Sequence, residues 1–95
     1  MTDPKLLILA SLAESDKHGY AIIQDVQRFA GVRLGAGTLY GAITRLEAQG
    51  WIRPLDSEDR RKPYRLTAEG RRSLEEQMEA LDRVVQTALR RLRPA

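Results

Sequence analysis

The fold of this chain is decided by residues 37–52, GTLYGAITRLEAQGWI. Within this stretch Leu39, Ile43 and Leu46 are spaced i, i+4 and i+7, which places them on one face of an α-helix. We therefore predict a helix over about residues 36–49 that buries this apolar face and is ended by Gly50.

The opposite face of this predicted helix is small and polar and carries no acidic residue. It consists of Gly37, Gly41, Thr44, Arg45 and Ala48, with Thr38 and Tyr40 at its flanks. Such a surface lets a helix approach base edges closely, and Arg45 there can pair with guanine or with phosphate. Gly41 costs about 1 kcal/mol relative to alanine inside a helix, and a close-approach surface accounts for it. Thr38, Tyr40, Thr44 and Arg45 are therefore candidate DNA-binding residues, the alternative being a merely solvated face.

Two further helices are predicted upstream of this stretch. The first spans about residues 4–14, with Asp3 as its N-cap and Pro4 in its first turn. After a turn at residues 15–19 the second helix runs to Gly31, a plausible C-cap. Its apolar positions recur at three- and four-residue steps, as Tyr20, Ile23, Val26, Phe29 and Ala30 with Ile22 beside them. A short connection containing glycine then leads to the third helix.

Downstream, two short β-prone runs flank a polar tip and predict a β-hairpin. The runs are residues 51–55 and 62–66, and the tip is residues 56–61. Pro54 and Pro63 each remove a backbone donor, so both strands are expected to be irregular or to lie at an edge.

The last predicted helix begins after Thr67 as its N-cap and carries a heptad seam. The seam steps by four and three residues through Leu74, Met78, Leu81, Val85, Ala88 and Leu92. About 25 residues at 1.5 Å each give a helix of roughly 37 Å, whereas a domain of this size has a radius of gyration of only about 12–13 Å. We therefore expect the helix to overhang the body and to pair with a second copy, in an orientation that the seam does not define. The alternative is a helix folded back on the body as ordinary core.

The order helix–helix–helix–hairpin–helix is that of a winged helix-turn-helix, a mainly α fold with a small β-hairpin, extended here by a long dimerisation helix. In this architecture the third helix enters the major groove and the hairpin contacts the flanking backbone. We assign residues 1–67 to DNA binding and residues 68–95 to dimerisation. Trp51 is expected to anchor the base of the hairpin in the core, and Tyr64 to pack within the hairpin.

Composition argues against other classes of function. The 95 residues include no cysteine and one histidine, which excludes disulfides and argues against a metal site. The sequence carries no Ser-His-Asp, metal-ligand or phosphate-loop pattern, so neither an enzyme nor a cofactor is predicted. No stretch approaches the roughly 20 apolar residues of a membrane span, and a cytoplasmic location is expected. The formal net charge of +3 is compatible with a polyanionic partner.

Three segments together resemble the PadR family of bacterial transcriptional regulators. Residues 37–52 resemble the family signature, and residues 18–22, HGYAI, resemble the start of its second helix. Residues 61–70, RKPYRLTAEG, resemble its second wing strand and the beginning of its last helix. The motifs stand in the family's order and spacing over almost the whole chain, and the single C-terminal helix resembles the family's compact subgroup.

This resemblance implies a homodimeric winged-helix repressor that binds an inverted-repeat operator in double-stranded DNA, often in its own promoter, and is released by a small-molecule effector. It implies that Thr38, Tyr40 and Arg45 face DNA from the third helix. It also implies that His18, Gly19 and Tyr20 bring a helix N-terminus near a phosphate, and that Arg60, Arg61 and Lys62 lie on the wing. The effector is not identified, and a last helix without aromatic residues does not support the aromatic sandwich of some multidrug-binding relatives.

Two departures from the family pattern bear on DNA binding. Gly35 and Gly41 stand where the family usually has a small hydroxyl residue and a proline, which weakens the start of the third helix. The wing balances Asp56, Glu58 and Asp59 against Arg60, Arg61 and Lys62, so only its descending side is expected to contact DNA. This neutral wing keeps an alternative open, a protein-interaction adaptor that does not bind DNA specifically.

Overall fold

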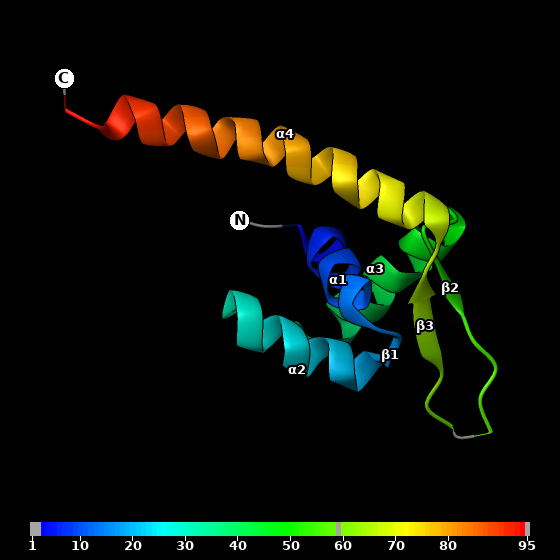
Figure 1. Ribbon diagram of the computed structural model, residues 1–95. Helices are drawn as coiled ribbons and strands as arrows, with labels where there is room; N and C mark the ends of the chain where they lie inside the picture. The colour runs from blue at the N-terminus through cyan, green and yellow to red at the C-terminus, as the bar shows by residue number, and fades with distance from the viewer. Residues whose placement is uncertain (1–2, 59, 95) are drawn as a thin grey trace.

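The computed structural model describes residues 3–58 and 60–94 and confirms the predicted winged helix-turn-helix with a long C-terminal helix (Figure 1). Its helices are α1 (Pro4–Glu14), α2 (Gly19–Ala30), α3 (Ala36–Ala48) and α4 (Ala68–Leu92). Its strands are β1 (Lys17–His18), β2 (Ile52–Pro54) and β3 (Pro63–Leu66). The first three helices and the hairpin form the body, and α4 runs across it and beyond.

The predicted helix ends are confirmed by their capping geometry. The carboxylate of Asp3 accepts a hydrogen bond from the backbone N–H of Lys5 at 2.9 Å, and the Thr67 hydroxyl accepts one from that of Gly70 at 3.0 Å. Gly31 ends α2 and Gly50 follows α3 with φ of 67° and 77°, left-handed values that favour glycine. These stop signals are local, which is why the sequence alone located them.

The sheet has three antiparallel strands in the order β1–β3–β2, one more than the predicted hairpin. Residues 15–19 were expected to form only a turn, but Lys17 pairs with Tyr64 and His18 with Pro63. A two-residue strand is too short to show an alternating pattern, so it could not be seen in the sequence. The pairing makes β3 the central strand instead of an edge, and Pro63 is tolerated because it is the first residue of that strand.

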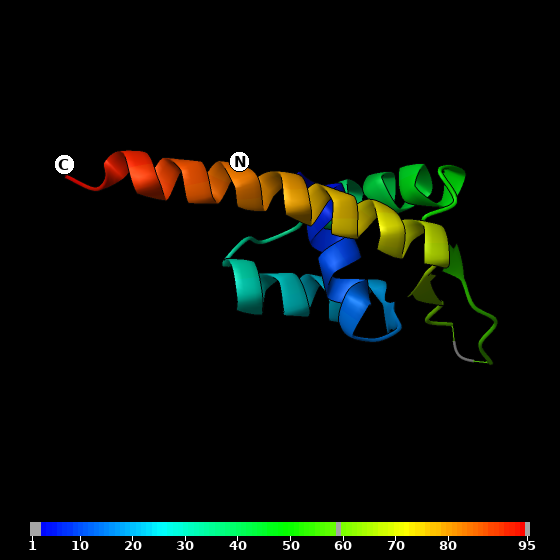
Figure 2. The same cartoon turned by 45° about the horizontal axis from the view of Figure 1, so that its top comes forward.

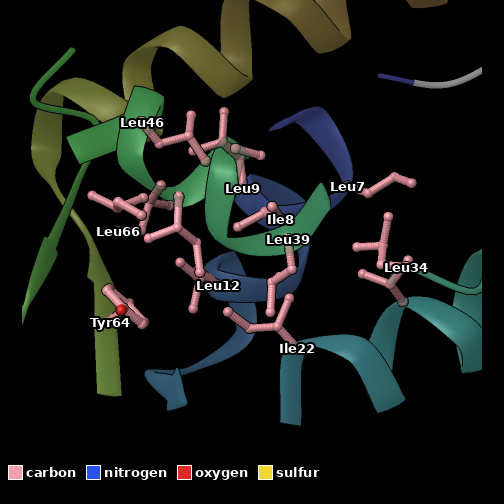
Figure 3. Packing of buried hydrophobic residues seen from close by; sticks show 14 of the residues in the cluster. Leu7, Ile8, Leu9, Leu12, Ile22, Leu34, Leu39, Leu46, Tyr64 and Leu66 are labelled. Atoms are coloured by element: carbon pink, nitrogen blue, oxygen red, sulfur yellow. The ribbon is translucent and has the colours of Figure 1, made fainter. Parts of the chain in front are cut away.

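The core lies where α1, α2 and α3 meet the base of the hairpin. Figure 3 shows Ile8 and Leu9 of α1 beside Leu39 and Leu46 of α3, with Tyr64 of β3 at the margin. The predicted apolar face of α3 is confirmed, because Leu39, Ile43 and Leu46 are all buried. The packing roles predicted for Trp51 and Tyr64 are also confirmed. Trp51 packs partly buried against this core, and Tyr64 belongs to it.

The buried side of α2 differs from the predicted stripe. Ile22, Asp25 and Val26 are buried, whereas Tyr20 and Phe29 are 61% and 51% exposed, and Ala30 is exposed as well. One of the buried residues is thus an acid, and its carboxylate is held inside the body by a hydrogen bond of 2.7 Å from the Ser11 hydroxyl. Hydrophobic periodicity does not register a buried acid, which explains the error.

A small polar cluster connects α1, β1 and α2 beneath the core. Lys17 donates from Nζ to the carbonyl oxygen of Ser11 at 2.5 Å and lies 3.8 Å from the Asp25 carboxylate. Both side chains of this ion pair are about nine-tenths buried. Arg28 approaches the same carboxylate from the surface at 3.5 Å. The hydrogen bond from Ser11, with the two cations, holds the pKa of Asp25 below its usual range against the opposing effect of burial.

The helix α4 extends past the body in both views (Figures 1 and 2). Its 25 residues give the chain extents of 60 × 26 × 20 Å and a radius of gyration of 15.1 Å, above the roughly 12–13 Å of a compact domain of this length. The predicted overhang is therefore confirmed. The first turns do pack on the body, and a Cβ on Gly70 would collide with the carbonyl oxygen of Trp51. No helix in residues 3–58 and 60–94 is long and apolar enough to cross a membrane.

Candidate nucleic-acid interface

The outer face of α3 is exposed and nearly bare of side-chain bulk. A Cβ built on Gly37 or on Gly41 would meet no atom within 4 Å. Thr44 lies between them and the helix C-terminus, and its hydroxyl donates to the carbonyl oxygen of Tyr40 at 2.9 Å. We call Gly37, Gly41, Thr44 and Ala48 the ridge of α3, and all four are exposed. A helix with such a ridge can bring its backbone close to base edges in a groove.

Beside this ridge a hollow of about 380 Å³ gathers residues from α2, α3 and the wing. Its lining is His18, Gly19, Tyr20, Tyr40, Arg60, Arg61, Lys62 and Tyr64. Seven of these were predicted from the sequence as DNA-binding residues, and the fold brings them together although they lie up to 44 positions apart. We call this site the wing hollow.

His18 shapes the wing hollow by capping α2. Its Nδ1 accepts a hydrogen bond from the backbone N–H of Ala21 at 3.3 Å. A neutral imidazole that accepts through Nδ1 carries its proton on Nε2, so the other ring nitrogen is a donor. The expectation that His18 stands at a helix start is thereby met, and the residue also lines the hollow.

Tyr40 is the aromatic side chain that joins α3 to the start of α2. It is 49% exposed, and a Cβ built on Gly19 would lie 2.5 Å from its hydroxyl oxygen. Gly19 itself is buried. The glycine therefore allows the phenol to lie against the N-terminus of α2, inside the wing hollow.

The charge in the wing hollow is positive. Arg60, Arg61 and Lys62 are exposed, and none forms an ion pair with another described residue. Asp56 and Glu58 are exposed on the ascending side of the wing and do not line the hollow, while Asp59 falls outside the described residues. The wing cations therefore line the hollow and Asp56 and Glu58 do not, while the prediction that only the descending side contacts DNA stays a prediction.

The base of the wing is tied to the segment between α1 and β1. The guanidinium of Arg65 on β3 donates to both carboxylate oxygens of Asp16, the shortest of these bonds measuring 2.8 Å. This hydrogen bonding holds the pKa of Asp16 below its usual range. Nearby, burial raises the pKa of the Tyr64 phenol, and the charge of Glu47 adds to this effect.

Thr38 and Arg45 do not lie in the wing hollow. They line a second, smaller hollow of about 260 Å³ on the other flank of α3, where it meets the N-terminus of α1. Thr44 lines neither hollow and lies on the ridge. The predicted DNA-binding residues therefore fall into three groups, on the two flanks of α3 and along the ridge between them.

The predicted dimer seam on α4 is divided between core and surface. Leu74 is only 9% exposed and belongs to the core of its own chain, so it is not available to a partner. Met78, Leu81, Val85, Ala88 and Leu92 are exposed or partly exposed. Val84 and Leu89, which the heptad spacing did not include, widen this apolar strip on either side.

Sequence reasoning missed Lys5, Lys17 and Asp25. Lys17 and Asp25 are ordinary surface residues by type, and only the packing of α1 on α2 shows that they are paired and buried. Lys5 lines the second hollow beside Arg45. Across the described residues no cluster of three or more His, Cys, Asp or Glu side chains could hold a metal ion.

Comparison with known proteins gives a consistent result. A protein-family model described as the transcriptional regulator PadR-like family matches residues 8–76. The transcriptional regulator Rv3488 of Mycobacterium tuberculosis is 37% identical over 89 residues, covering 90% of this chain and 81% of that protein. An uncharacterized 37.1 kDa protein in transposon TN4556 of Streptomyces fradiae is 43% identical over 82 residues, covering 86% of this chain. This chain spans only 24% of the length of that longer protein.

Solved structures agree with these matches. The crystal structure of a PadR family transcription regulator from Clostridium difficile superposes with a TM-score of 0.86 and 28% identity, covering 97% of this chain and all of that one. The winged-helix DNA-binding protein F93 from STIV, at 23% identity, shares the fold with a TM-score of 0.77 over 84% of this chain and 88% of its own. The matched proteins with a described role are regulators of transcription or DNA-binding proteins, not enzymes.

Proposed function

Because the chain belongs to the PadR-like family of transcriptional regulators, we propose that it is a homodimeric repressor that binds an inverted-repeat operator in double-stranded DNA. The ridge of α3 enters the major groove, and the wing hollow receives a backbone phosphate. The observation that carries this proposal is the wing hollow itself, which three cations of the wing line together with tyrosines of α2, α3 and β3. A phosphate there meets the cations of the wing, the phenol of Tyr40 and the Nε2–H of His18.

The second copy is proposed to cover the exposed apolar strip of α4. Met78, Leu81, Val85 and Leu92 are large apolar side chains on a helix that protrudes from the body. Full burial of an exposed side chain of this kind contributes at most about 1.5–3 kcal/mol, and less where the side chain is already half covered. In this division of roles residues 1–67 contact DNA and residues 68–95 supply the dimer contacts, of which the exposed part begins at Met78.

The charge of α4 favours antiparallel pairing of the two helices. Its first part, residues 69–82, carries five acidic residues and two arginines, whereas residues 83–93 carry four arginines and no acid. An antiparallel pair places each acidic half beside a basic half, while a parallel pair places like charges together. This polarity supports the arrangement that the seam alone left open.

Repression follows from the geometry of such a dimer. Two α3 helices must stand about 34–36 Å apart to enter successive major grooves on one side of the duplex. A small-molecule effector that changes this separation releases the operator, because both half-sites can then no longer be bound together. Bound to a promoter, the dimer blocks access to it.

The proposal is tested by fluorescence anisotropy with labelled duplex DNA from the region upstream of the chain's own coding sequence, at two salt concentrations. We expect saturable binding that weakens as salt rises, because phosphate contacts release counterions. Tyr40→Ala should weaken this binding while light scattering still reports a dimer. Absent or salt-insensitive binding would instead favour the adaptor, whose exposed α4 strip docks on another protein.

A further inference from the structure

The second hollow joins the N-terminus of α1 to α3. Its lining is Asp3, Pro4, Lys5, Gly37, Thr38, Gly41, Ala42 and Arg45. Two of these side chains, Lys5 and Arg45, are cations, and neither forms an ion pair with another residue in the described ranges. We call this site the α1 hollow.

The two hollows lie on opposite flanks of α3. At about 100° per residue, Arg45 is separated from Tyr40 by roughly 140° around the helix axis, and Thr38 from Tyr40 by roughly 160°. The ridge residues Gly37 and Gly41 lie between these flanks. One bare ridge is therefore bordered by cations on both sides, from the wing on one flank and from Lys5 and Arg45 on the other.

Side chains, and not the helix N-terminus, would bind a ligand in the α1 hollow. The Asp3 carboxylate accepts the backbone N–H of Lys5 at 2.9 Å, and the Asp3 carbonyl accepts those of Leu6 and Leu7. Pro4 at the first helical position has no N–H. The Asp3 carboxylate thus caps its own helix, and the other polar side chains that line the hollow are Lys5, Arg45 and Thr38, which leaves two cations there against one acid.

We propose that Lys5 and Arg45 form a second phosphate anchor, which holds the DNA strand across the major groove from the strand held by the wing hollow. This inference rests on the proposed function. The major groove is about 12 Å wide and is bordered by the phosphates of the two strands, while a helix with its side chains is about 10–12 Å across. A helix lying in the groove therefore presents its two flanks to opposite backbones. Arg45 then acts mainly as a positioning contact, and bases are read from the ridge.

The test uses a duplex enriched from a random-sequence library by the wild-type protein, and the variants Lys5→Gln and Arg72→Gln. Arg72 is an exposed arginine on α4 outside both hollows, so its variant removes the same charge elsewhere. We expect Lys5→Gln to reduce the slope of log Kd against log salt by about 0.9 per protomer, and Arg72→Gln to leave it unchanged. In phosphate ethylation interference, DNA binding by Lys5→Gln should no longer be reduced by ethylation of one phosphate in its half-site. DNA binding by Arg61→Gln should no longer be reduced by ethylation of a phosphate on the opposite strand.

Arg45→Lys separates a phosphate contact from base recognition. A lysine replaces an arginine at a phosphate as a point charge but cannot reproduce the bidentate contact to guanine. We expect Arg45→Lys to keep the sequence preference of the wild type within about threefold. Three results would overturn the anchor while leaving DNA binding intact. The first is an equal salt slope for Lys5→Gln and Arg72→Gln, and the second is that the two affected phosphates lie on one strand. The third is a changed base preference in Arg45→Lys. Failure of the wild type to enrich any duplex would overturn the proposed function, and the anchor with it.

Discussion

Gly19 and Tyr40 are matched across the junction of α2 and α3, because a Cβ on Gly19 would lie 2.5 Å from the Tyr40 hydroxyl oxygen. The backbone of Gly19 has no positive φ, so its glycine is explained by close packing, first against the Tyr40 phenol and then against the buried Leu39 side chain at 3.1 Å. The phenol is thereby held in the wing hollow beside the wing cations. A glycine buried in one helix thus determines where a half-exposed aromatic side chain of the next helix lies.

Gly19→Ala should weaken operator binding about tenfold while the protein stays folded. The added methyl group displaces the phenol, which can move into solvent because Tyr40 is half exposed, so DNA binding weakens. The methyl group also lies 3.1 Å from the buried Leu39 side chain, so some stability is lost as well. Anisotropy titrations and thermal unfolding measure the two effects. A double-mutant cycle provides the control, because Gly19→Ala should cost almost nothing in the Tyr40→Ala background. Additive losses would show that Gly19 acts independently of Tyr40.

Gly41 should lower the stability of α3 and at the same time allow its close approach to DNA. No atom lies within 4 Å of the position that a Cβ would take, so Gly41→Ala should raise the free energy of unfolding by about 1 kcal/mol through the higher helix propensity of alanine. A larger side chain on the ridge keeps α3 away from the base edges, so Gly41→Leu should fold and lose operator binding more than tenfold. Circular dichroism melting and anisotropy test both effects. Tight operator binding by Gly41→Leu would show that the ridge does not enter the groove.

Leu81→Glu combined with Val85→Glu should produce monomers. Both side chains are about half exposed on the protruding part of α4, where a partner helix would desolvate the new charges at high cost. Light scattering at several concentrations measures the change in mass. Gln86→Glu, which places a charge outside the apolar strip, should leave the dimer intact. A mass that does not change in the double variant would show that α4 is not the interface.

The antiparallel orientation can be tested by oxidation, because the chain has no cysteine of its own. In an antiparallel pair two copies of residue 92 stand far apart, so Leu92→Cys should not form an intermolecular disulfide, whose Cα atoms must lie within about 7 Å. Non-reducing electrophoresis after mild oxidation reports the result. Rapid and complete cross-linking of Leu92→Cys dimers would indicate a parallel pair.

The protein should lose stability in acid through Asp25 and Asp16. Hydrogen bonding lowers the pKa of each carboxyl in the folded state, from Ser11 onto Asp25 and from Arg65 onto Asp16. A lowered folded pKa means that the contribution is complete above the unfolded value of about 3.9 and disappears as the pH falls through the folded value. The melting temperature should therefore fall as the pH decreases from about 5 toward 2.

Asp25→Asn identifies the larger source of this acid sensitivity. The change leaves the buried ammonium of Lys17 without its counter-charge, so we expect a loss of about 3 kcal/mol at neutral pH and a flatter pH dependence. The exposed pair is compared through Asp16→Asn, which should cost much less, because both side chains of that ion pair are more than a third exposed. An equal loss in the two variants would contradict the structural role of the buried cluster.

The sequence by itself determined the helices, their ends and the apolar face of α3. The positions of Asp3, Gly31, Gly50 and Thr67 could be assigned because capping acts between residues two to four positions apart. The spacing of Leu39, Ile43 and Leu46 predicted their burial because helical periodicity is also local. The protruding α4 followed from its length compared with that of the body.

The tertiary structure alone decided which residues meet. Segments far apart in the chain are joined by the pairing of β1 with β3 and by the fit of Tyr40 against Gly19. The same is true of the two hollows that gather most of the predicted DNA-binding residues. It also placed Asp25 inside, Phe29 outside and Leu74 in the core of its own chain. Residue type and periodicity indicate whether a side chain favours water or the core. Its actual burial depends on the neighbours that pack against it, and these neighbours come from other elements of the fold.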